Sequence, residues 1–332
     1  MRILFYSTRP YEEPFLQAME SSLHVFSLKT ASLSVETASL ASGYDAVSIF
    51  TSDDASAPVL DILHANGVRF IAIRATGFDN VDIVHANRLG ISVANVPHYS
   101  PESIAEHAIA LLLALNRKLV SANRQVHRYD FTLDTLVGSV LYGKTAGVIG
   151  TGRTGRAAVR ILHGFGCKLL ANDLYPDAAF GDKYEVQYTD LTTLIQSSDI
   201  ITLHAPLNAQ TKYLINGTTI GQMKRGVQLV NTSRGGLVNT DDLIEYLLDG
   251  HIGAYGMDVY EKEKGIFFHD LSQQPPDDPN LKILLSLPNV LITPHQAFAT
   301  REALQTIVRI MMENINAWAS GEPAPHMLHV AP

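Results

Sequence analysis

Cysteine and clustered positive charge are both scarce in this chain of 332 residues. The single cysteine, Cys167, excludes an internal disulfide, so we expect it to pack in the interior. The formal net charge is −8, the pI is about 5.9, and the Arg and Lys residues are dispersed along the chain. Such a chain lacks the basic patch that nucleic acid requires, so we predict no nucleic-acid partner.

Long apolar runs and metal-binding patterns are also missing. The longest apolar run, at 108–115, is far shorter than the roughly 20 residues that span a bilayer. Met1 and Arg2 lead directly into an apolar strand, without the pattern of a signal peptide. The thirteen histidines form no H-E-x-x-H or similar set, which disfavours a metal site. The sequence therefore predicts a cytoplasmic protein with no membrane partner and no metal.

The chain is too long for one ordinary core, so two domains are expected. Residues 1–100 alternate strand-like and helix-like patterns, which is typical of an open α/β domain. This part has no glycine-rich phosphate loop, so we expect it to carry substrate contacts rather than a nucleotide. Strands are predicted at 2–7, 24–29, 45–50, 69–76 and 91–96, and helices at 14–21, 58–65 and 81–89.

A longer helix is predicted from Pro101, which takes the first helical position behind the cap residue Ser100. Its apolar pattern continues well past Leu115. Because the centre of this helix is apolar nearly all round, we expect it to be buried between domains or in a subunit interface.

The stretch 144–173 carries the most informative pattern. An apolar run at 145–149 predicts a buried strand, and three glycines follow it at the spacing G-x-G-x-x-G. A helical pattern at 156–162 and a second strand that leads to Asp173 complete the unit. A glycine-rich turn in this context favours dinucleotide binding.

The residues of this turn have separate tasks. Gly150 permits the tight turn, Gly152 lets the main chain approach a pyrophosphate, and Gly155 lets the helix pack closely on the sheet. The positive end of the helix then faces the phosphates. Asp173 accepts hydrogen bonds from an adenine ribose and would repel the 2′-phosphate of NADP, so NAD is the expected cofactor. The predicted contacts are Gly150, Gly152, Arg153, Thr154, Gly155 and Asp173.

The alternation resumes after Asp173 and predicts a doubly wound parallel sheet. Polar residues stand at the carboxyl ends of its strands, the edge where open α/β sheets bind ligands; they are His204, Arg234, Asp258 and His295. Strands are predicted at 200–206, 227–233, 253–259 and 290–295, helices at 191–196, 221–224, 241–248 and 300–319, and a loop at 265–280.

Several motifs along the chain resemble those of the D-2-hydroxyacid dehydrogenases. They are GTGRTG with Asp173, LHAPL at 203–207, VNTSRGGLVN at 230–239, GMDVYEKE at 256–263 and TPHQAF at 293–298. RATGFDNVD at 74–82 and VPHYSPESIAEHA at 96–108 are more narrowly similar to the fermentative D-lactate branch. The resemblance implies an α/β protein with two doubly wound open-sheet domains. A flavodoxin-like substrate domain would comprise 1–98 and 297–332, a Rossmann NAD domain 99–296, and the active site would lie in the cleft.

Reduction of a 2-oxo acid needs a cation for the carboxylate and an acid for the ketone oxygen. Arg234 offers a two-pronged guanidinium, and His295 is assigned the proton transfer. Glu263 stands in the position from which the family's glutamate bonds that imidazole, and a carboxylate there favours its charged form.

The remaining site residues are assigned to the cofactor or to the substrate. By resemblance, Asp258 contacts the nicotinamide side, and the main-chain N–H groups of Thr76 and Gly77 receive the substrate carboxylate. We assign His204, Pro206 and Thr232 to the cofactor site. Aromatic residues, namely Phe50, Tyr99 and Phe298, are expected to restrict the substrate pocket to a methyl group.

The sequence therefore predicts an NAD-dependent D-lactate dehydrogenase that reduces pyruvate, and the family implies a homodimer through the 101–125 region or a homotetramer. Two alternatives stay open: another D-2-hydroxyacid dehydrogenase, for a larger 2-oxo acid or hydroxypyruvate, and an NAD-sensing binding protein on the same fold. Structural roles also stay open for some residues. Arg234 can cap a helix or pair with Asp241, Glu261 and Glu263 can form a solvated turn, and His98 and His107 are interpreted as packing or interface residues.

Overall fold

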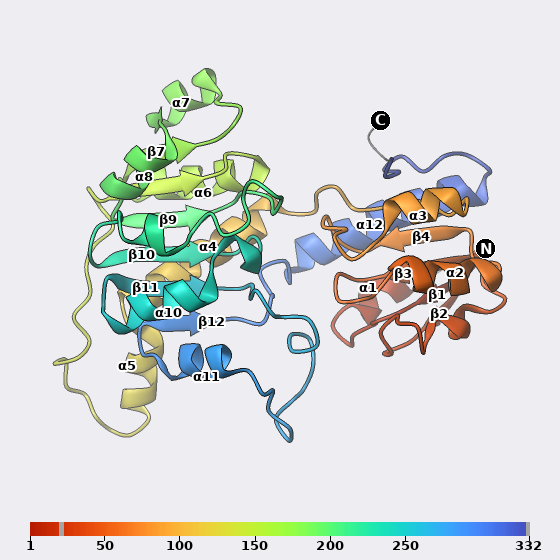
Figure 1. The fold of residues 1–332 in the computed structure, drawn as a ribbon, viewed down its shortest axis with the longest axis horizontal. Coiled ribbons are helices and arrows are strands. Elements are labelled where there is room, and N and C mark those ends of the chain that lie inside the picture. The colour runs from red at the N-terminus through yellow and green to blue at the C-terminus, as the bar shows by residue number, and fades with distance from the viewer. Residues whose placement is uncertain (20–22, 330–332) are drawn as a thin grey trace. The chain divides into compact units, whose positions relative to one another are not determined.

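The computed structural model describes residues 1–19 and 23–329. The chain forms two compact units, one of Met1–Ser100 with Ala299–Pro332 and one of Pro101–Phe298 (Figure 1). Each unit contains one sheet in which all neighbouring strands are parallel. The predicted α/β class with two doubly wound sheets is confirmed.

The first unit has a five-stranded sheet in the order β2-β1-β3-β4-β5, which is the flavodoxin-like order. Its central strands are apolar because helices cover both faces, and β3 is buried throughout. The strands are β1 (Arg2–Phe5), β2 (Val25–Leu28), β3 (Ala46–Ile49), β4 (Phe70–Ile73) and β5 (Ser92–Ala94). The helices are α1 (Glu13–Gln17), the 3₁₀ turn η1 (Ala38–Ala41), α2 (Ala57–Ala65), α3 (Ile83–Arg88) and α12 (Arg301–Ala319).

The second unit has a seven-stranded sheet in the order β12-β11-β10-β9-β6-β7-β8. Strand order reverses between β6 and β9, which is the position where doubly wound sheets bind ligands. The strands are β6 (Thr145–Ile149), β7 (Lys168–Asn172), β8 (Val186–Tyr188), β9 (Ile200–Leu203), β10 (Val227–Asn231), β11 (Ile252–Met257) and β12 (Val290–Ile292). The helices are α4 (Pro101–Asn116), α5 (Leu119–Val126), α6 (Arg153–Gly164), α7 (Ala178–Tyr184), α8 (Leu191–Ser197), α9 (Gly217–Ile220), η2 (Gly235–Leu237), α10 (Thr240–Leu248) and α11 (Pro279–Ser286).

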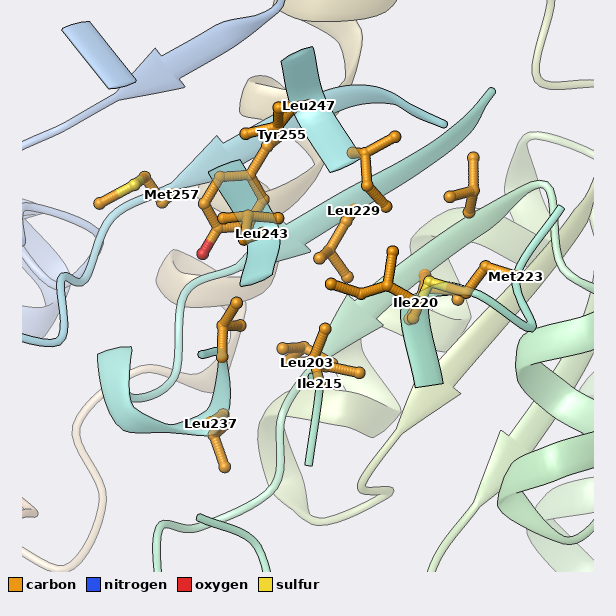
Figure 2. Close-up of a cluster of buried hydrophobic side chains, with 14 of the residues drawn as sticks. Leu203, Ile215, Ile220, Met223, Leu229, Leu237, Leu243, Leu247, Tyr255 and Met257 are labelled. Carbon is orange, nitrogen blue, oxygen red and sulfur yellow. The ribbon is translucent and has the colours of Figure 1, made fainter. Parts of the chain in front are cut away.

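A large apolar cluster supports the strands that end at the candidate site (Figure 2). Leu203 of β9, Leu229 of β10 and Met257 of β11 pack with side chains of α10 such as Leu243. Burying a leucine of this kind contributes about 1.5–3 kcal/mol. The ends of β9, β10 and β11 are therefore fixed by a dry core, while the residues that follow them are polar.

Several helices differ from the sequence predictions. The helix from Pro101 does not continue well past Leu115, because it ends at Asn116 and Lys118 takes a left-handed conformation with φ 51° before α5. The helix predicted at 221–224 was placed too late, since a capping box between Asn216 and Thr219 starts α9 earlier. The predicted end of a helix at Ser21 lies outside the described residues. Six of the elements in the described residues were not predicted: η1, α5, α7, β8, η2 and α11.

Cys167 lies in the core of the second unit, where burial raises the pKa of its thiol. Its Sγ donates to the carbonyl of Leu141 at 3.4 Å. Among residues 1–19 and 23–329, no helix is long and apolar enough to cross a membrane.

Candidate active site

The turn after β6 has the geometry of a phosphate-binding loop. Gly150 has φ +91°, and a Cβ there would lie 2.7 Å from the carbonyl carbon of His204. A Cβ on Gly155 would lie 1.9 Å from the carbonyl oxygen of Gly150, so the helix packs at a distance only glycine allows. A Cβ on Gly152 would meet no protein atom within 4 Å, which leaves space for a ligand at the start of α6. Arg153 and Thr154 form the first turn of α6.

Asp173 lies directly beyond β7 and is held by the glycine-rich turn. Its carboxylate accepts the N–H of Thr151 at 2.5 Å, the hydroxyl of Thr151 at 3.0 Å and the N–H of Tyr175 at 2.8 Å. Burial alone would raise the pKa of Asp173, but these bonds and the nearby Arg156 outweigh it and lower that pKa. A negative charge is therefore kept beside the turn at neutral pH.

Two buried polar atoms mark the ends of β9 and β10. Neither His204 Nδ1 nor Thr232 Oγ1 has a hydrogen-bond partner in the described part of the chain. Buried polar atoms are normally satisfied, so unpaired ones at this edge fit a site that a bound group completes. Burial also lowers the pKa of His204 to about 4, so its ring is neutral at physiological pH and is unsuited to proton donation in reduction. Pro206 follows, exposed, beyond β9.

A histidine and a carboxylate meet beyond β12. His295 Nδ1 lies 3.0 Å from Glu263 Oε1, and the other carboxylate oxygen accepts the N–H of Tyr260 at 3.0 Å. Both side chains are partly exposed, at 20% and 30%. The ring of Phe268 lies 5.6 Å from the imidazole, measured between centroids. The carboxylate thus orients an accessible imidazole, which is the arrangement of an acid–base pair.

The turn that carries Arg234 packs tightly on the loop that carries Glu263. A Cβ on Gly235 would lie 2.1 Å from the carbonyl carbon of Tyr260, so only glycine permits this approach. Asn231 at the end of β10 donates to the carbonyl of Arg234 at 2.9 Å and fixes the turn. The guanidinium donates to the carbonyl of Ser233 at 2.8 Å. The second unit therefore brings the segments bearing Arg234, Glu263 and His295 to one edge of its sheet.

Glu261 has a different role from Glu263. Its carboxylate accepts hydrogen bonds from the hydroxyls of Tyr213 and Thr240. The sequence left open a solvated turn for both glutamates, whereas the structure gives each a specific partner.

The candidate residues of the first unit also follow strand ends. Thr76 and Gly77 lie beyond β4, where the Thr76 hydroxyl donates to the carbonyl of Val96 at 2.8 Å. No acceptor among the described residues bonds the N–H of Thr76 or Gly77. Phe50 is buried beyond β3, with the Arg74 guanidinium 6.0 Å from its ring centroid, and Tyr99 is half-buried.

A sequence profile described as the NAD-binding domain of D-isomer specific 2-hydroxyacid dehydrogenases matches residues 109–297. The chain belongs to this dehydrogenase family. The protein is therefore an oxidoreductase and its cofactor is NAD, which fits the Gly152 space and the unpaired atoms of His204 and Thr232.

The family assignment extends over the whole chain. D-lactate dehydrogenase of Escherichia coli is 45% identical over 330 residues, which cover 99% of this chain and 100% of that protein. Its apo structure superposes with a TM-score of 0.90 at 42% identity, covering 99% and 100% of the two chains. The pyruvate reductase structure of Chlamydomonas reinhardtii has a TM-score of 0.92 at 41% identity, covering 98% of each chain. A D-2-hydroxyisocaproate dehydrogenase structure has a TM-score of 0.85 at 32% identity, covering 99% of each.

Sequence reasoning missed one part of this dehydrogenase's site. His107 was interpreted as a packing or interface residue, but its Nε2 lies 2.9 Å from the hydroxyl of Thr293 and 3.4 Å from Asp258. Asp258 was assigned to the nicotinamide, yet its buried carboxylate also accepts several protein hydrogen bonds. The only sequence signal was the placement of Asp258 at a strand end.

Proposed function

We propose that this protein is an NAD-dependent D-lactate dehydrogenase that reduces pyruvate to D-lactate. The observation that carries the proposal is the bond of 3.0 Å between His295 and Glu263, on the same sheet edge as Arg234. Relatives named for D-lactate and for pyruvate, similar along the whole chain, support the choice of substrate.

In this proposal the second unit supplies charge and a proton. Arg234 holds the pyruvate carboxylate through its guanidinium. Glu263 occupies Nδ1 of His295, so Nε2 is the nitrogen that protonates the ketone oxygen in reduction and accepts the proton in oxidation. Bound NADH supplies the hydride when the carbonyl is polarised in this way. Thr76 and Gly77 offer unpaired main-chain N–H groups to the same carboxylate.

The cofactor contacts proposed for the second unit follow the glycine-rich turn and the strand ends. Gly150, Gly152 and the first turn of α6 receive the pyrophosphate, and Asp173 receives the adenine ribose. His204, Pro206 and Thr232 line the cofactor beyond β9 and β10. Asp258 is proposed to contact the nicotinamide side, as the family resemblance implies.

The substrate pocket is proposed to fit a methyl group, with Phe298, Tyr99 and Phe50 restricting its size. The similarity to a D-2-hydroxyisocaproate dehydrogenase favours a larger 2-oxo acid as the second candidate. NADH oxidation with pyruvate, 2-oxobutyrate, phenylpyruvate, glyoxylate and hydroxypyruvate separates the two. We expect pyruvate to rank above phenylpyruvate and Phe298→Ala to relax that order by about 1–3 kcal/mol. A higher kcat/KM for phenylpyruvate would reject the small pocket, and no turnover with any acid would favour an NAD sensor.

A homodimer is proposed through the 101–125 region, which the resemblance implies, extended by the chain that follows it into the segment 119–142, with a tetramer as the alternative. This segment of the second unit exposes many large apolar side chains: Leu119, Val126, Tyr129, Phe131, Leu133, Val137, Val140 and Tyr142. Such a concentration is typical of an interface. Sedimentation of the parent and of Phe131→Glu measures the state, and a monomeric parent would reject the proposal. Cytoplasmic location stays a prediction of the sequence.

A further inference from the structure

His295 has a main-chain conformation that its neighbours must impose. Its φ is 56°, in the left-handed region that residues with a Cβ rarely adopt. Its N–H donates to the carbonyl of Thr293 at 3.0 Å within a tight turn. A residue held in this region is strained and persists only where surrounding contacts fix it.

Asp258 supplies the first of those contacts. The carboxylate is fully buried just beyond β11. It accepts the hydroxyl of Thr293 at 2.6 Å, before His295, and the N–H groups of Gln296 and Ala297 at 2.8 Å each, after it. One carboxylate therefore binds the turn on both sides of the imidazole-bearing residue.

Helix α4 supplies the second set of contacts. His107 Nε2 lies 2.9 Å from the hydroxyl oxygen of Thr293, and Ser103 donates to the carbonyl of Ala297 at 2.5 Å. Positions 103 and 107 are four apart, so their side chains lie on one face of the helix. This face of α4 contacts the residues before and after His295.

The donors form an ordered chain. The Thr293 hydroxyl has one proton, which it gives to Asp258, so its oxygen accepts from His107 Nε2–H. Consecutive hydrogen bonds shielded from water strengthen one another, and these two are partly buried, so the loss of one leaves the next unsatisfied. Removing the His107 donor should therefore loosen Thr293 and, through it, the turn.

We propose that His107 and Ser103 of α4 are positioning residues for His295, acting through Thr293, Asp258 and the Ala297 carbonyl to hold the left-handed turn. The proposal rests on the proposed function only in giving His295 the proton transfer. Reaction rates depend steeply on such placement, since a displacement of about 1 Å can cost 10²-fold. Neither His107 nor Ser103 needs to touch the substrate.

The test compares His107→Leu, which removes the donor, with His107→Gln, whose amide nitrogen replaces Nε2. We expect His107→Leu to lower kcat for pyruvate reduction about 10-fold or more, with the Kd for NADH changed less than about 3-fold. His107→Gln should restore most of kcat. The isotope effect from NADH deuterated at the transferred position should rise in His107→Leu as the chemical step becomes slower.

Matched variants distinguish a loss of His295 positioning from a general loss of structure. His251→Leu removes a different partly buried ring, whose Nε2 lies 3.1 Å from the Met223 carbonyl, and should leave kcat within about 2-fold. Thr293→Val should lose as much as His107→Leu, and the double variant should lose little more, because both break one chain. If His107→Leu fails to fold, Thr293→Val and Ser103→Ala carry the same test.

An NMR measurement on His295 tests the positioning role of His107 without relying on substrate turnover. In ¹⁵N-histidine NMR of the full chain, His107→Leu should shift the Nδ1 resonance of His295, whereas His107→Gln and His251→Leu should not. A parent without 2-oxo acid turnover would reject the proposed function, yet these shifts would still support the positioning. An unchanged His295 resonance and unchanged kcat in His107→Leu, or equal losses in His107→Leu and His107→Gln, would overturn it.

Discussion

Several turns of the second unit adopt a positive φ, and the two that follow β6 and β12 do so by different means. After β6, Gly150 adopts φ +91°, whereas after β12, His295 adopts φ 56°. The first turn presents main chain, so a residue without a Cβ suffices. The second must present an imidazole, so the conformation is imposed by Asp258 and by α4. Where a turn with a positive φ presents only main chain, a glycine is enough. Where the same conformation must carry a functional side chain, contacts from other parts of the fold have to hold it.

The largest effect is expected at His295, where the side chain and the backbone can be separated. His295→Gly removes the proton donor but favours the left-handed turn. Pyruvate reduction should fall on the order of 10²-fold or more. The free energy of unfolding in urea should change by less than about 1 kcal/mol, because relief of strain offsets the added freedom of the unfolded chain. A rate within 10-fold of the parent would remove His295 from the proton transfer.

Substitution of Gly150 in the glycine-rich turn should have the opposite effect, with a large loss of stability. Gly150→Ala places a Cβ 2.7 Å from the His204 carbonyl carbon at a strained φ, so the free energy of unfolding should fall by about 2 kcal/mol or more. Gly152→Ala is the matched control, because its Cβ meets no protein atom within 4 Å. That variant should keep its stability in urea but bind NADH more weakly in a fluorescence titration. Unaltered NADH affinity in Gly152→Ala would place the pyrophosphate elsewhere.

Asp173 tests whether the first turn selects the cofactor. Its pKa lies below the ordinary value, so the carboxylate is charged across the neutral range and repels a 2′-phosphate. Asp173→Ala should narrow the preference for NADH over NADPH by about 10-fold in kcat/KM, which is roughly 1.4 kcal/mol. Asp182→Ala is the control, because Asp182 is an exposed acid on α7. It should not change the ratio of kcat/KM for NADH to kcat/KM for NADPH. Equal efficiency with both cofactors in the parent would contradict this role.

The smallest expected effect concerns the carboxylate beside His295. Glu263→Gln keeps the shape of the side chain but replaces the carboxylate that binds His295 Nδ1 with an amide, so kcat/KM for pyruvate should fall by about 3-fold as the ring is held less firmly. Steady-state kinetics of pyruvate reduction measure this loss. Glu261→Gln is the comparison, since Glu261 bonds Tyr213 and Thr240 instead. Equal kcat/KM values in the parent and in Glu263→Gln would mean that the carboxylate does not orient the ring.

The sequence predicted the first turn well because its determinants are local. Gly150, Gly152 and Gly155 stand within six residues, and the flanking strand and helix are adjacent to them. Strand ends followed from apolar runs, which placed His204, Arg234 and His295 on one edge. Glu263 came from the family resemblance, and its distance to His295 was visible only in the fold.

The turn that carries His295 could not be predicted from the sequence, because the residues that hold it are distant in the chain. His107 and Thr293 are 186 residues apart, and no spacing rule joins them. The predictions of short helices failed for another reason, because the N-cap residue can decide where such a helix starts. Asn216 starts α9 and Asp177 starts α7, so the apolar pattern that followed was a poor guide.

The most direct test of the central claim is chiral analysis of the lactate that the purified protein forms from pyruvate and NADH. The resemblance and the named relatives predict D-lactate, formed by the parent and lost with His295→Gly. Predominantly L-lactate, or D-lactate formed as fast without the imidazole, would contradict the account.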